Sequence, residues 1–397
     1  MTGLVATVLV ICATIVVASY KQKPLAMHEG GRSHTFSTLT NPHIPDFAVH
    51  IKQRGSNDDL DWCNDNVKKD QPVGVGFSYA KSGRDVSNSE TSATEVDIFF
   101  QLFFYNLPHY SKSKVHLFGE SYAGHYIPAI GRRIYRENLE APTKNPNRLL
   151  INLASLGIGN GWVRPYIQFD YFADFLVDEK YGPFITEDHY KSLKEKYRVC
   201  GFLAHQCEVR PNRYTCIPAS AYCEPAFAFP SEIKRNAYDV RQECDEEAGQ
   251  VCYSIQDDID TYLNQGWVQE LIGVDREYRG CSAEVGKGFF LAGDEERRYD
   301  TAVAEVLEGG IKVLVYAGDA DYVCNWVGNE AWLNAMKWSG QQGYLDSPEG
   351  PFIVDKVEAG VFKTFENLTW LKIFGAGRMV PYDKPVESLE MILNWIE

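Results

Sequence analysis

The chain alternates short apolar runs with amphipathic stretches over most of its length. Residues 114–118 form an apolar run typical of a buried strand, and residues 92–107 are apolar at helical spacing. The same patterns predict further strands at residues 149–156, 311–316 and 369–374, and helices at residues 126–135, 302–307 and 386–396. Strands that alternate with helices and end in glycine-bearing loops predict an α/β fold with a mostly parallel sheet. In such sheets the chemistry lies at the carboxyl ends of the strands.

Two N-terminal segments depart from this alternation. Residues 4–18 are apolar but too short for a comfortable membrane span, and small residues followed by Lys21 and Lys23 come next. We predict a secretory signal peptide at residues 1–19, with a signal anchor as the alternative. Residues 30–69 are polar, rich in histidine, proline and charge, and have little periodicity. This composition is typical of a pro-segment or linker, which we place at residues 20–69.

Composition and charge narrow the class of partner. The chain has 397 residues, of which 45% are apolar, so it is long enough for one large core, or for a core with an inserted subdomain. Its formal net charge of −15 argues against nucleic acid or an anionic membrane as the main partner, because both favour clustered lysine and arginine. Small molecules and peptides remain open.

The cysteines favour an oxidising compartment. Nine remain after Cys12 in the signal segment, and six of them lie between Cys200 and Cys252. A zinc site would more typically offer two Cys-x-x-Cys pairs or added histidines, so a disulfide-stapled insertion is the better interpretation and no metal is expected. The odd total predicts at least one free thiol. Asn367 begins the only usable glycosylation sequon, which is compatible with secretion.

A serine in a tight turn is the first candidate for chemistry. Residues 119–124 read GESYAG, with Ser121 between the predicted strand 114–118 and a predicted helix. This is the context of a nucleophile elbow, in which a sharp turn pushes the hydroxyl above the sheet, although an ordinary strand-to-helix turn is the alternative. The acid and the histidine should follow later strands, in that order. Asp319 and Asp321 occupy the acid position, and Arg378 stands where the histidine is expected.

Longer motifs make the assignment specific. DQPVGVGFSY at residues 70–79, GESYAGHYIP at 119–128, IGNG at 158–161, AGDADYVCNW at 317–326 and AGRMVP at 376–381 occur in this order. They resemble the serine carboxypeptidase family, and within it the fungal vacuolar carboxypeptidase Y group. The resemblance covers most of residues 70–397 and disfavours a lipase or esterase, which the elbow alone would permit. It implies an α/β-hydrolase fold with its core at residues 70–163 and 294–397, and a cysteine-rich lid at residues 164–293.

The same resemblance implies roles for individual residues. It makes Ser121 the nucleophile of peptide hydrolysis at C-termini, through an acyl-serine intermediate, and it makes Asp321 the orienting acid. It implies no cofactor. The remaining assignments are an oxyanion donor at the Tyr122 amide, substrate contacts at Glu120, Cys324 and Met379, and disulfides joining Cys200 to Cys223, Cys207 to Cys216 and Cys244 to Cys252. Cys281 bonds in the family to a cysteine that this chain lacks, so a pairing with Cys63 stays open.

Two departures from the family pattern predict a loss of catalysis. Arg378 stays protonated at ordinary pH and therefore cannot accept the serine proton. All nine histidines lie between His28 and His205, away from the last two strands, and His125 is better suited to a structural role. The second departure is the absence of a glycine-rich loop that supplies the second oxyanion donor and most of the carboxylate clamp. A block that includes the first strands of the sheet is missing between Lys68 and Asp70.

Three interpretations follow from these departures. The first is a serine carboxypeptidase-family protein that is inactive or severely impaired. The second is a non-catalytic peptide-binding or decoy protein, and the third is the product of a faulty gene model of an active enzyme. The expected partners are peptides or proteins, through their C-termini, with no nucleic acid and no membrane after signal removal. We expect a monomer in the secretory pathway, delivered to the vacuole or the cell exterior.

Overall fold

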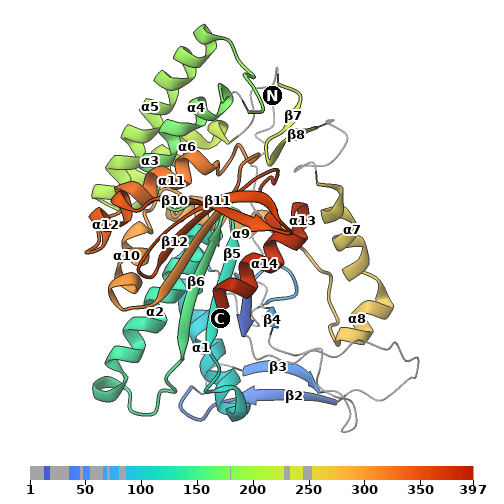
Figure 1. Ribbon diagram of the computed structural model, residues 1–397. Helices are drawn as coiled ribbons and strands as arrows, with labels where there is room; N and C mark the ends of the chain where they lie inside the picture. The colour runs from blue at the N-terminus through green and yellow to red at the C-terminus, as the bar shows by residue number, and fades with distance from the viewer. Residues whose placement is uncertain are drawn as a thin grey trace.

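A mixed eight-stranded sheet forms the centre of the molecule (Figure 1). The computed structural model describes residues 13–17, 35–44, 48–53, 66–68, 72–79, 86–178, 180–227, 233–244 and 253–396. The sheet has the order β10-β11-β12-β9-β6-β5-β1-β4. Its strands are β1 (Ala13–Val17), β4 (Asn66–Lys68), β5 (Val115–Glu120), β6 (Leu153–Gly159), β9 (Lys312–Gly318), β10 (Glu349–Val354), β11 (Val357–Phe365) and β12 (Leu368–Ile373). Strands β5, β6, β9 and β12 are parallel neighbours, which confirms the predicted α/β class.

Helices cover both faces of this sheet because its strands are apolar on both sides. Along β9, Val313 and Val315 belong to a core cluster shared with α1 (Ser89–Asn106), α2 (Ala123–Lys144) and α10 (Asp300–Glu308). The alternate residues Leu314 and Tyr316 pack on the other face, with Trp395 of α14 (Pro385–Ile396). This period of two is what a strand buried on both faces requires. Because β5, β6 and β9 are parallel neighbours, their carboxyl ends lie at the same edge of the sheet.

The described residues between 164 and 293 are mainly helical and form the lid above that edge (Figure 1). A long helical pair, α5 (Glu187–Val209) and α6 (Arg213–Cys223), is joined by disulfides Cys200–Cys223 and Cys207–Cys216, as the family resemblance implied. Cys244 is also disulfide-bonded, and Cys252 lies outside the described residues. The other lid elements are α3 (Pro165–Gln168), α4 (Phe172–Leu176), the hairpin β7 (Arg235–Asn236) and β8 (Asp239–Glu243), α7 (Ser254–Leu263), α8 (Gly266–Ile272) and α9 (Ala283–Ala292).

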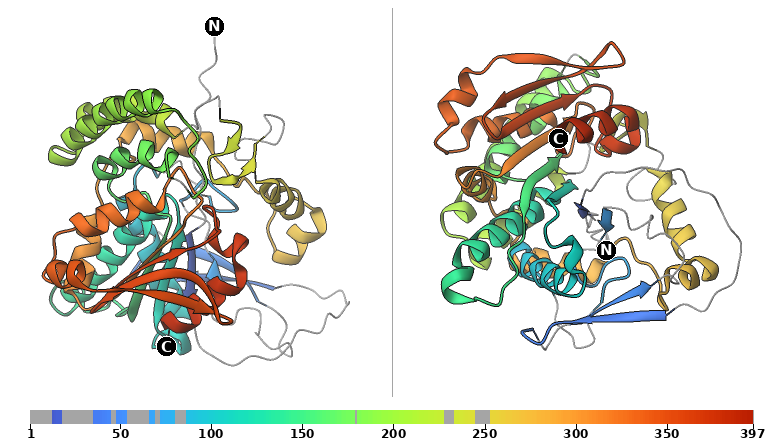
Figure 2. Two further views of the ribbon diagram at one scale, coloured as in Figure 1. Left: turned by 45° about the horizontal axis from the view of Figure 1, so that its top comes forward. Right: turned by 60° about the horizontal axis from the view of Figure 1, so that its bottom comes forward.

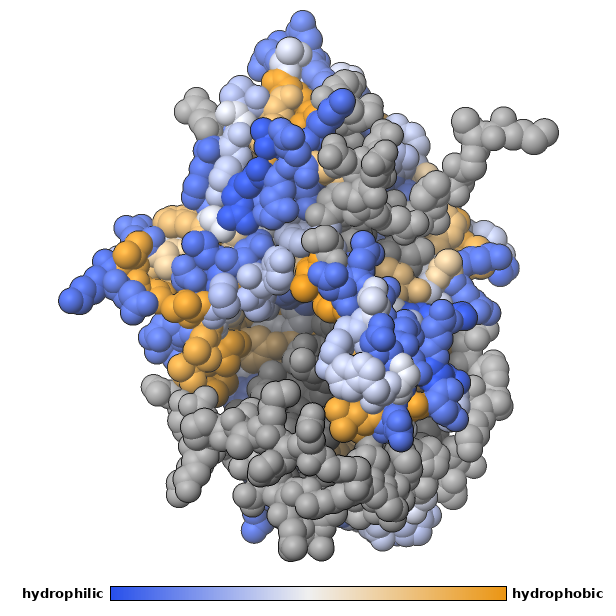
Figure 3. Space-filling model, turned by 90° about the vertical axis from the view of Figure 1, so that its right-hand side faces the viewer, coloured by the Kyte–Doolittle hydropathy of each residue, from blue (hydrophilic) through white to orange (hydrophobic). Residues whose placement is uncertain are grey.

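Helices α7 and α8 stand to one side of the body (Figures 1 and 2). Exposed apolar side chains on this pair include Ile259, Trp267 and Leu271. Figure 3, which views the molecule from this side, shows the apolar side chains in separate patches between polar ones. Isolated exposed apolar residues are common on soluble proteins. The described residues contain no helix that is long and apolar enough to cross a membrane.

The N-terminal part contains more regular structure than its sequence pattern suggested. Strands β2 (Thr35–Thr40) and β3 (Ala48–Gln53) form an antiparallel hairpin, which lies next to α1. Leu39 is buried, and Asn106 of α1 donates a hydrogen bond to the carbonyl of Thr40. Strand β1 lies within the segment predicted as a signal peptide. It pairs antiparallel with β5 on one side and with β4 on the other, so these two short strands occupy the sheet position beyond β5.

Three elements near the C-terminal half were not predicted from periodicity. They are the helices α11 (Trp326–Ala335) and α12 (Gln341–Asp346) and the hairpin formed by β10 and β11. The hairpin lies at the sheet edge, where β10 alternates between exposed and partly buried residues. A last short helix, α13 (Val380–Asp383), follows the loop that carries Arg378.

Candidate active site

Ser121 occupies a strained turn between β5 and α2, as the elbow motif predicts. Its φ angle of 68° is in the left-handed region that residues with side chains rarely adopt. The turn is held because the Ser121 amide donates to the carbonyl of Gly159 at 2.8 Å, and the Ser121 carbonyl accepts from the amide of Trp162 at 2.9 Å. Small neighbours are required here, since a Cβ on Gly124 would lie 2.5 Å from the carbonyl oxygen of Trp162. The hydroxyl is therefore fixed at the carboxyl edge of the sheet.

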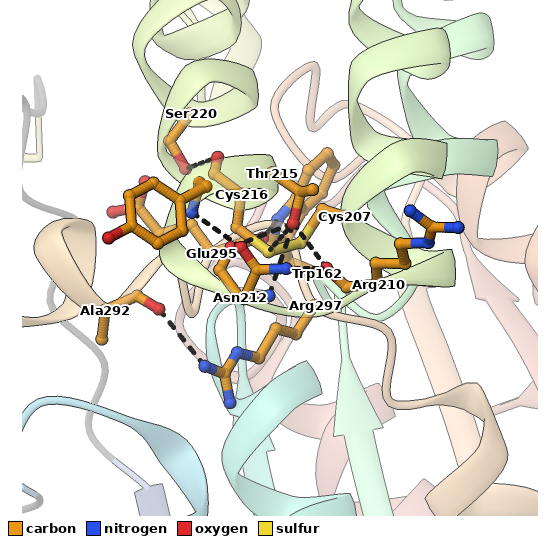
Figure 4. The surroundings of a disulfide bond; sticks show 11 residues. Trp162, Cys207, Arg210, Asn212, Thr215, Cys216, Ser220, Ala292, Glu295 and Arg297 are labelled. Carbon is orange, nitrogen blue, oxygen red and sulfur yellow. Dashed lines mark hydrogen bonds between the residues drawn. A yellow bond between two sulfur atoms is a disulfide. The ribbon is translucent and has the colours of Figure 1, made fainter.

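Trp162 also connects this turn to the lid. Its indole nitrogen donates to the carbonyl of Glu295 at 2.8 Å, next to the disulfide between Cys207 and Cys216 (Figure 4). Its ring packs edge-on against Phe169 and Phe172 in the lid cluster. The nucleophile turn and the disulfide-bonded helical pair are therefore coupled through one buried side chain.

Arg378 lies beside Ser121, in the position where a serine hydrolase needs its base. The side chain is 6% exposed, and its Nη2 donates hydrogen bonds to Ser121 Oγ and, at 3.4 Å, to Cys324 Sγ. The guanidinium also lies 4.8 Å from the ring centroid of Tyr238. A guanidinium has five donors and no acceptor. The serine hydroxyl is therefore held as a hydrogen-bond acceptor, which is the reverse of its role towards a general base.

Asp321 lies in the loop after β9 and is fully buried. Its carboxylate accepts hydrogen bonds from the amides of Val323 at 3.0 Å and Cys324 at 3.2 Å. Burial raises the pKa of Asp321 to about 7, although the charge of Arg378, the two amides and the side chain of Asn160 all lower it. Among the described residues Asp321 and Arg378 share no hydrogen bond, so the acid influences the arginine through charge alone.

The residues expected to contact substrate surround the same point. Glu120 ends β5 and accepts a hydrogen bond from the hydroxyl of Tyr316 at 3.2 Å. Burial raises the pKa of Glu120 to about 8, against the lowering effects of Tyr316 and Arg378. Burial likewise raises the pKa of the Cys324 thiol to about 12. Met379, next to Arg378, packs against the apolar cluster that contains Cys324. Their roles towards a substrate stay predictions.

Tyr122 follows Ser121 and is the N-cap residue of α2, but its side chain makes no capping hydrogen bond to that helix. Its hydroxyl instead donates to Asp294 at 2.9 Å, and its ring stacks on His125. His125 is fully buried, its Nδ1 lies 2.5 Å from the carbonyl oxygen of Trp162, and burial lowers its pKa. This histidine therefore belongs to the packing behind the turn. In the first turn of α2, the amides of Gly124 and His125 donate to the carbonyls of Ser121 at 3.0 Å and Tyr122 at 2.8 Å.

The lid hairpin clamps the loop that carries Arg378. The Arg378 amide donates to the carbonyl of Tyr238 at 2.8 Å. A Cβ on Gly377 would lie 2.4 Å from that same carbonyl oxygen, so the loop and the hairpin are in close contact. Asp383 accepts from the Gly377 amide at 2.6 Å and from Arg241 at 3.3 Å. The position of the guanidinium is therefore set by lid and core together.

Two contributors to this site were missed by the sequence analysis. Asn160 is fully buried, and its side chain bonds to the backbone of Gly318 and Cys324 and to Asp321, which joins the ends of β6 and β9. It lies in the IGNG motif, so the motif itself was a usable signal. Tyr238 lies in the lid, far from Arg378 in sequence, and no pattern in the chain indicates their contact.

Other predicted positions lie away from this cluster. Asn367 is half-buried in the turn between β11 and β12, where its carbonyl accepts from the amide of Val313, and its glycosylation stays a prediction. Cys281 is exposed, and Cys63 lies outside the described residues. Within the part of the chain that the structure describes, no three histidine, cysteine, aspartate or glutamate side chains form a metal-sized group.

Comparison with known proteins places the chain in a family. The serine carboxypeptidase family model matches residues 69–397. Carboxypeptidase Y of Candida albicans is 38% identical over 330 residues, which are 82% of this chain and 58% of that protein. Carboxypeptidase Y of Schizosaccharomyces pombe is 38% identical over 335 residues, which are 83% of this chain and 33% of that protein. The chain thus spans between a third and three fifths of the length of these two relatives.

A solved structure shows the same fold. The prohormone-processing carboxypeptidase Kex1 of Saccharomyces cerevisiae superposes with a TM-score of 0.67 and 22% sequence identity, covering 82% of this chain and 72% of that one. At this identity the likeness concerns the fold alone. Together with the family match over residues 69–397, it agrees with the elbow at Ser121 and the parallel strands that carry it. The chain belongs to the serine carboxypeptidase family.

Proposed function

We propose that this chain is a serine carboxypeptidase-family protein that has lost its catalytic activity. The family reaction needs a base that withdraws the proton from the nucleophile hydroxyl. The observation that carries the proposal is the hydrogen bond from Arg378 Nη2 to Ser121 Oγ. A cationic donor in this place stabilises the neutral hydroxyl as an acceptor and offers no lone pair for its proton. Ser121 is therefore an unactivated serine in an otherwise recognisable elbow.

The expected loss of activity is large. Removal of the histidine from a serine hydrolase costs about 10⁶-fold in turnover, or roughly 8 kcal/mol of transition-state stabilisation. Loss of one oxyanion donor typically costs about 10²–10³-fold. We propose that the family's glycine-rich loop is missing between Lys68 and Asp70, and we therefore expect both losses here. Peptide hydrolysis should consequently be no faster than background.

The test is hydrolysis of a blocked dipeptide with a free C-terminus by the purified full chain. The expected result is no release of the C-terminal amino acid above the rate in a Ser121→Ala variant. Release that is present in the original protein and disappears in Ser121→Ala would refute the proposal. The Ser121→Ala comparison also removes any contribution from contaminating peptidases.

A second candidate is a non-catalytic protein that binds peptides or other proteins through their C-termini. The buried cation in the cleft favours it, because an arginine can pair with a carboxylate. Calorimetry with free peptides tests it, and the absence of heat for every peptide would remove its basis. The third interpretation, a faulty gene model, is tested by sequencing the transcript across the codons for residues 68–70.

The proposed location is the secretory pathway, with delivery to the vacuole or the cell exterior. It is supported by the apolar run at residues 4–18 and by the lid disulfides, which persist in oxidising compartments. We propose a glycosylated monomer after signal removal. The retention of an Asn367→Gln variant on a concanavalin A column, compared with the original chain, would check the glycan.

A further inference from the structure

His116 is a buried histidine that the candidate active site does not use. It lies on β5 and is 3% exposed. Its Nδ1 lies 2.7 Å from the hydroxyl oxygen of Ser155, a fully buried residue of β6. The same oxygen accepts a hydrogen bond from the indole nitrogen of Trp395, on α14, at 2.9 Å. One buried hydroxyl therefore joins the histidine to α14.

The direction of these hydrogen bonds depends on the charge of His116. An indole nitrogen can only donate, so the Ser155 oxygen is the acceptor in its contact with Trp395. The Ser155 proton is then available for Nδ1 of a neutral histidine. A protonated histidine is a donor at both ring nitrogens, so the hydroxyl would have to accept from both sides and its proton would lose this acceptor. The hydrogen bonds therefore fit the neutral ring.

The surroundings of His116 also oppose a positive charge on the ring. The titratable side chains on the described elements around it are Lys114 beside β5, Glu120 on β5, Lys312 and Tyr316 on β9, and Glu387 and Glu390 on α14. Burial, followed by the charges of Lys114 and Lys312, lowers the pKa of His116 from 6.5 to about 4. No carboxylate among these side chains offsets that effect. The docked arrangement therefore excludes the charged form.

Helix α14 is attached to the sheet along a narrow stripe. Of its 12 residues, only Ser388, Met391 and Trp395 are buried. Lys312 donates a hydrogen bond from its Nζ to the carbonyl of Trp395 at 3.1 Å, and this nitrogen lies 4.8 Å from the indole ring centroid. An element with few buried contacts can open without unfolding of the whole molecule. The hydrogen bond to the indole is therefore one of few contacts that hold the helix.

We propose that His116, Ser155 and Trp395 form a pH-sensitive latch, in which protonation of the histidine releases α14 from the sheet. With a neutral ring, the Ser155 hydroxyl bridges the histidine and the indole, and α14 stays docked. A charged ring needs water, which reaches it when α14 moves away. The apolar cluster that includes Trp395 also contains Tyr316, whose hydroxyl donates to Glu120. The latch thus lies behind the candidate active site.

The sign and size of the pH effect follow from proton linkage. Because the pKa of His116 is lowered in the docked state, docking is most stable above the ordinary value of 6.5 and weakens as the pH falls towards about 4. With these two values, the ratio of released to docked molecules should rise about twentyfold between pH 7 and pH 5. Acidification should therefore loosen α14 before the rest of the fold.

The test is hydrogen exchange of the full chain at pH 7 and pH 5, followed by mass spectrometry of peptides. Protection factors, which compare each rate with that of an unstructured chain at the same pH, remove the intrinsic pH dependence of exchange. Peptides from residues 385–396 report on α14, and peptides from α2 serve as the internal reference. We expect the protection of α14 to fall about twentyfold and that of α2 to change little.

Variants connect the effect to the histidine. His116→Asn places an acceptor where Nδ1 lies and cannot gain a proton, so the protection of α14 should be equal at the two pH values. His109→Asn, which changes an exposed histidine in the turn after α1, is the matched control and should keep the twentyfold fall. If His116→Asn fails to fold, the comparison of α14 with α2 in the original chain still decides.

Equal protection of α14 at pH 7 and pH 5 in the original chain would overturn the proposal. A fall of the same size in His116→Asn would also overturn it, because another group would then respond to the pH. Parallel falls in α14 and α2 would count against it too, since they would indicate unfolding of the whole molecule.

Discussion

Glu296 provides a direct test of how burial of carboxyl groups couples the stability of this protein to pH. Glu296 is 2% exposed, and its Oε2 has no hydrogen-bond partner within the described residues. Burial, together with the adjacent Glu295, raises the pKa of Glu296 well above its ordinary value of 4.5. The folded state therefore keeps the proton over a pH range in which the unfolded chain has already released it.

The sign and size follow from proton linkage. Since the folded-state pKa is raised, the stabilising contribution is fully present below the unfolded pKa near 4.5 and decreases as the pH rises towards the folded-state value. One proton changes the free energy of unfolding by about 1.4 kcal/mol per pH unit. Over the two pH units between pH 5 and pH 7, ionisation of Glu296 alone can therefore lower the free energy of unfolding by at most about 3 kcal/mol.

The assay is urea unfolding at both pH values, followed by tryptophan fluorescence. Glu296→Gln replaces the protonated carboxyl with a neutral group of the same shape. Its loss of stability from pH 5 to pH 7 should therefore be smaller than that of the original chain, by up to about 3 kcal/mol. Glu358→Gln, on the exposed face of β11, is the matched control and should behave like the original. Equal pH dependence in the Glu296→Gln variant and the original chain would refute the reasoning.

Three further predictions concern packing and the site. Gly157→Ala should lower the free energy of unfolding by about 1–3 kcal/mol, because its Cβ would lie 2.2 Å from the ring of Phe118, whereas Gly266→Ala, with nothing within 4 Å, should be neutral. Thermal unfolding of the two variants checks this. Arg378→His alone should not restore peptide hydrolysis, because we expect this chain to lack the family loop that supplies the second oxyanion donor, and a blocked-dipeptide assay that gives turnover would contradict it. For the second candidate function, binding of a peptide carboxylate should weaken between pH 5.5 and pH 8, because the buried Asp321 and Glu120, with pKa values of about 7 and about 8, become negatively charged and repel the ligand, as calorimetry at both pH values would measure.

Elements with strong apolar periodicity were predictable from the sequence. Strand β5 and the elbow at Ser121 follow from an apolar run that ends at small residues, and the structure has both. Strand β6 was predicted too early, at residues 149–156, because Leu149 and Leu150 read as strand residues although Leu150 is exposed. The strand instead continues through Gly157, where the close approach of the Phe118 ring leaves no room for a side chain.

Contacts between segments far apart in the chain could not be predicted from the sequence. The edge hairpin of β10 and β11 has one exposed side, so its apolar residues do not form a continuous run. The stacking of Tyr238 on Arg378 depends on how the lid folds back over the sheet, which no local pattern specifies. The clustering of residues 120, 121, 321, 324 and 378 could nevertheless be anticipated, because each ends a strand of the parallel sheet or lies in the loop that follows one, while their roles stay predictions.

Strand β1 lies in the predicted signal peptide and is also part of the central sheet. Its five residues pair with β5 from Val115 to Gly119, immediately before the nucleophile turn. Proteolytic processing at residue 19 would take this strand away and leave the edge of a fully buried strand without its hydrogen-bond partner. A leader that is removed on export and a strand that completes the sheet are mutually exclusive fates for one segment. If residues 1–19 are removed as predicted, the chain after cleavage would expose the edge of β5 that β1 covers before cleavage.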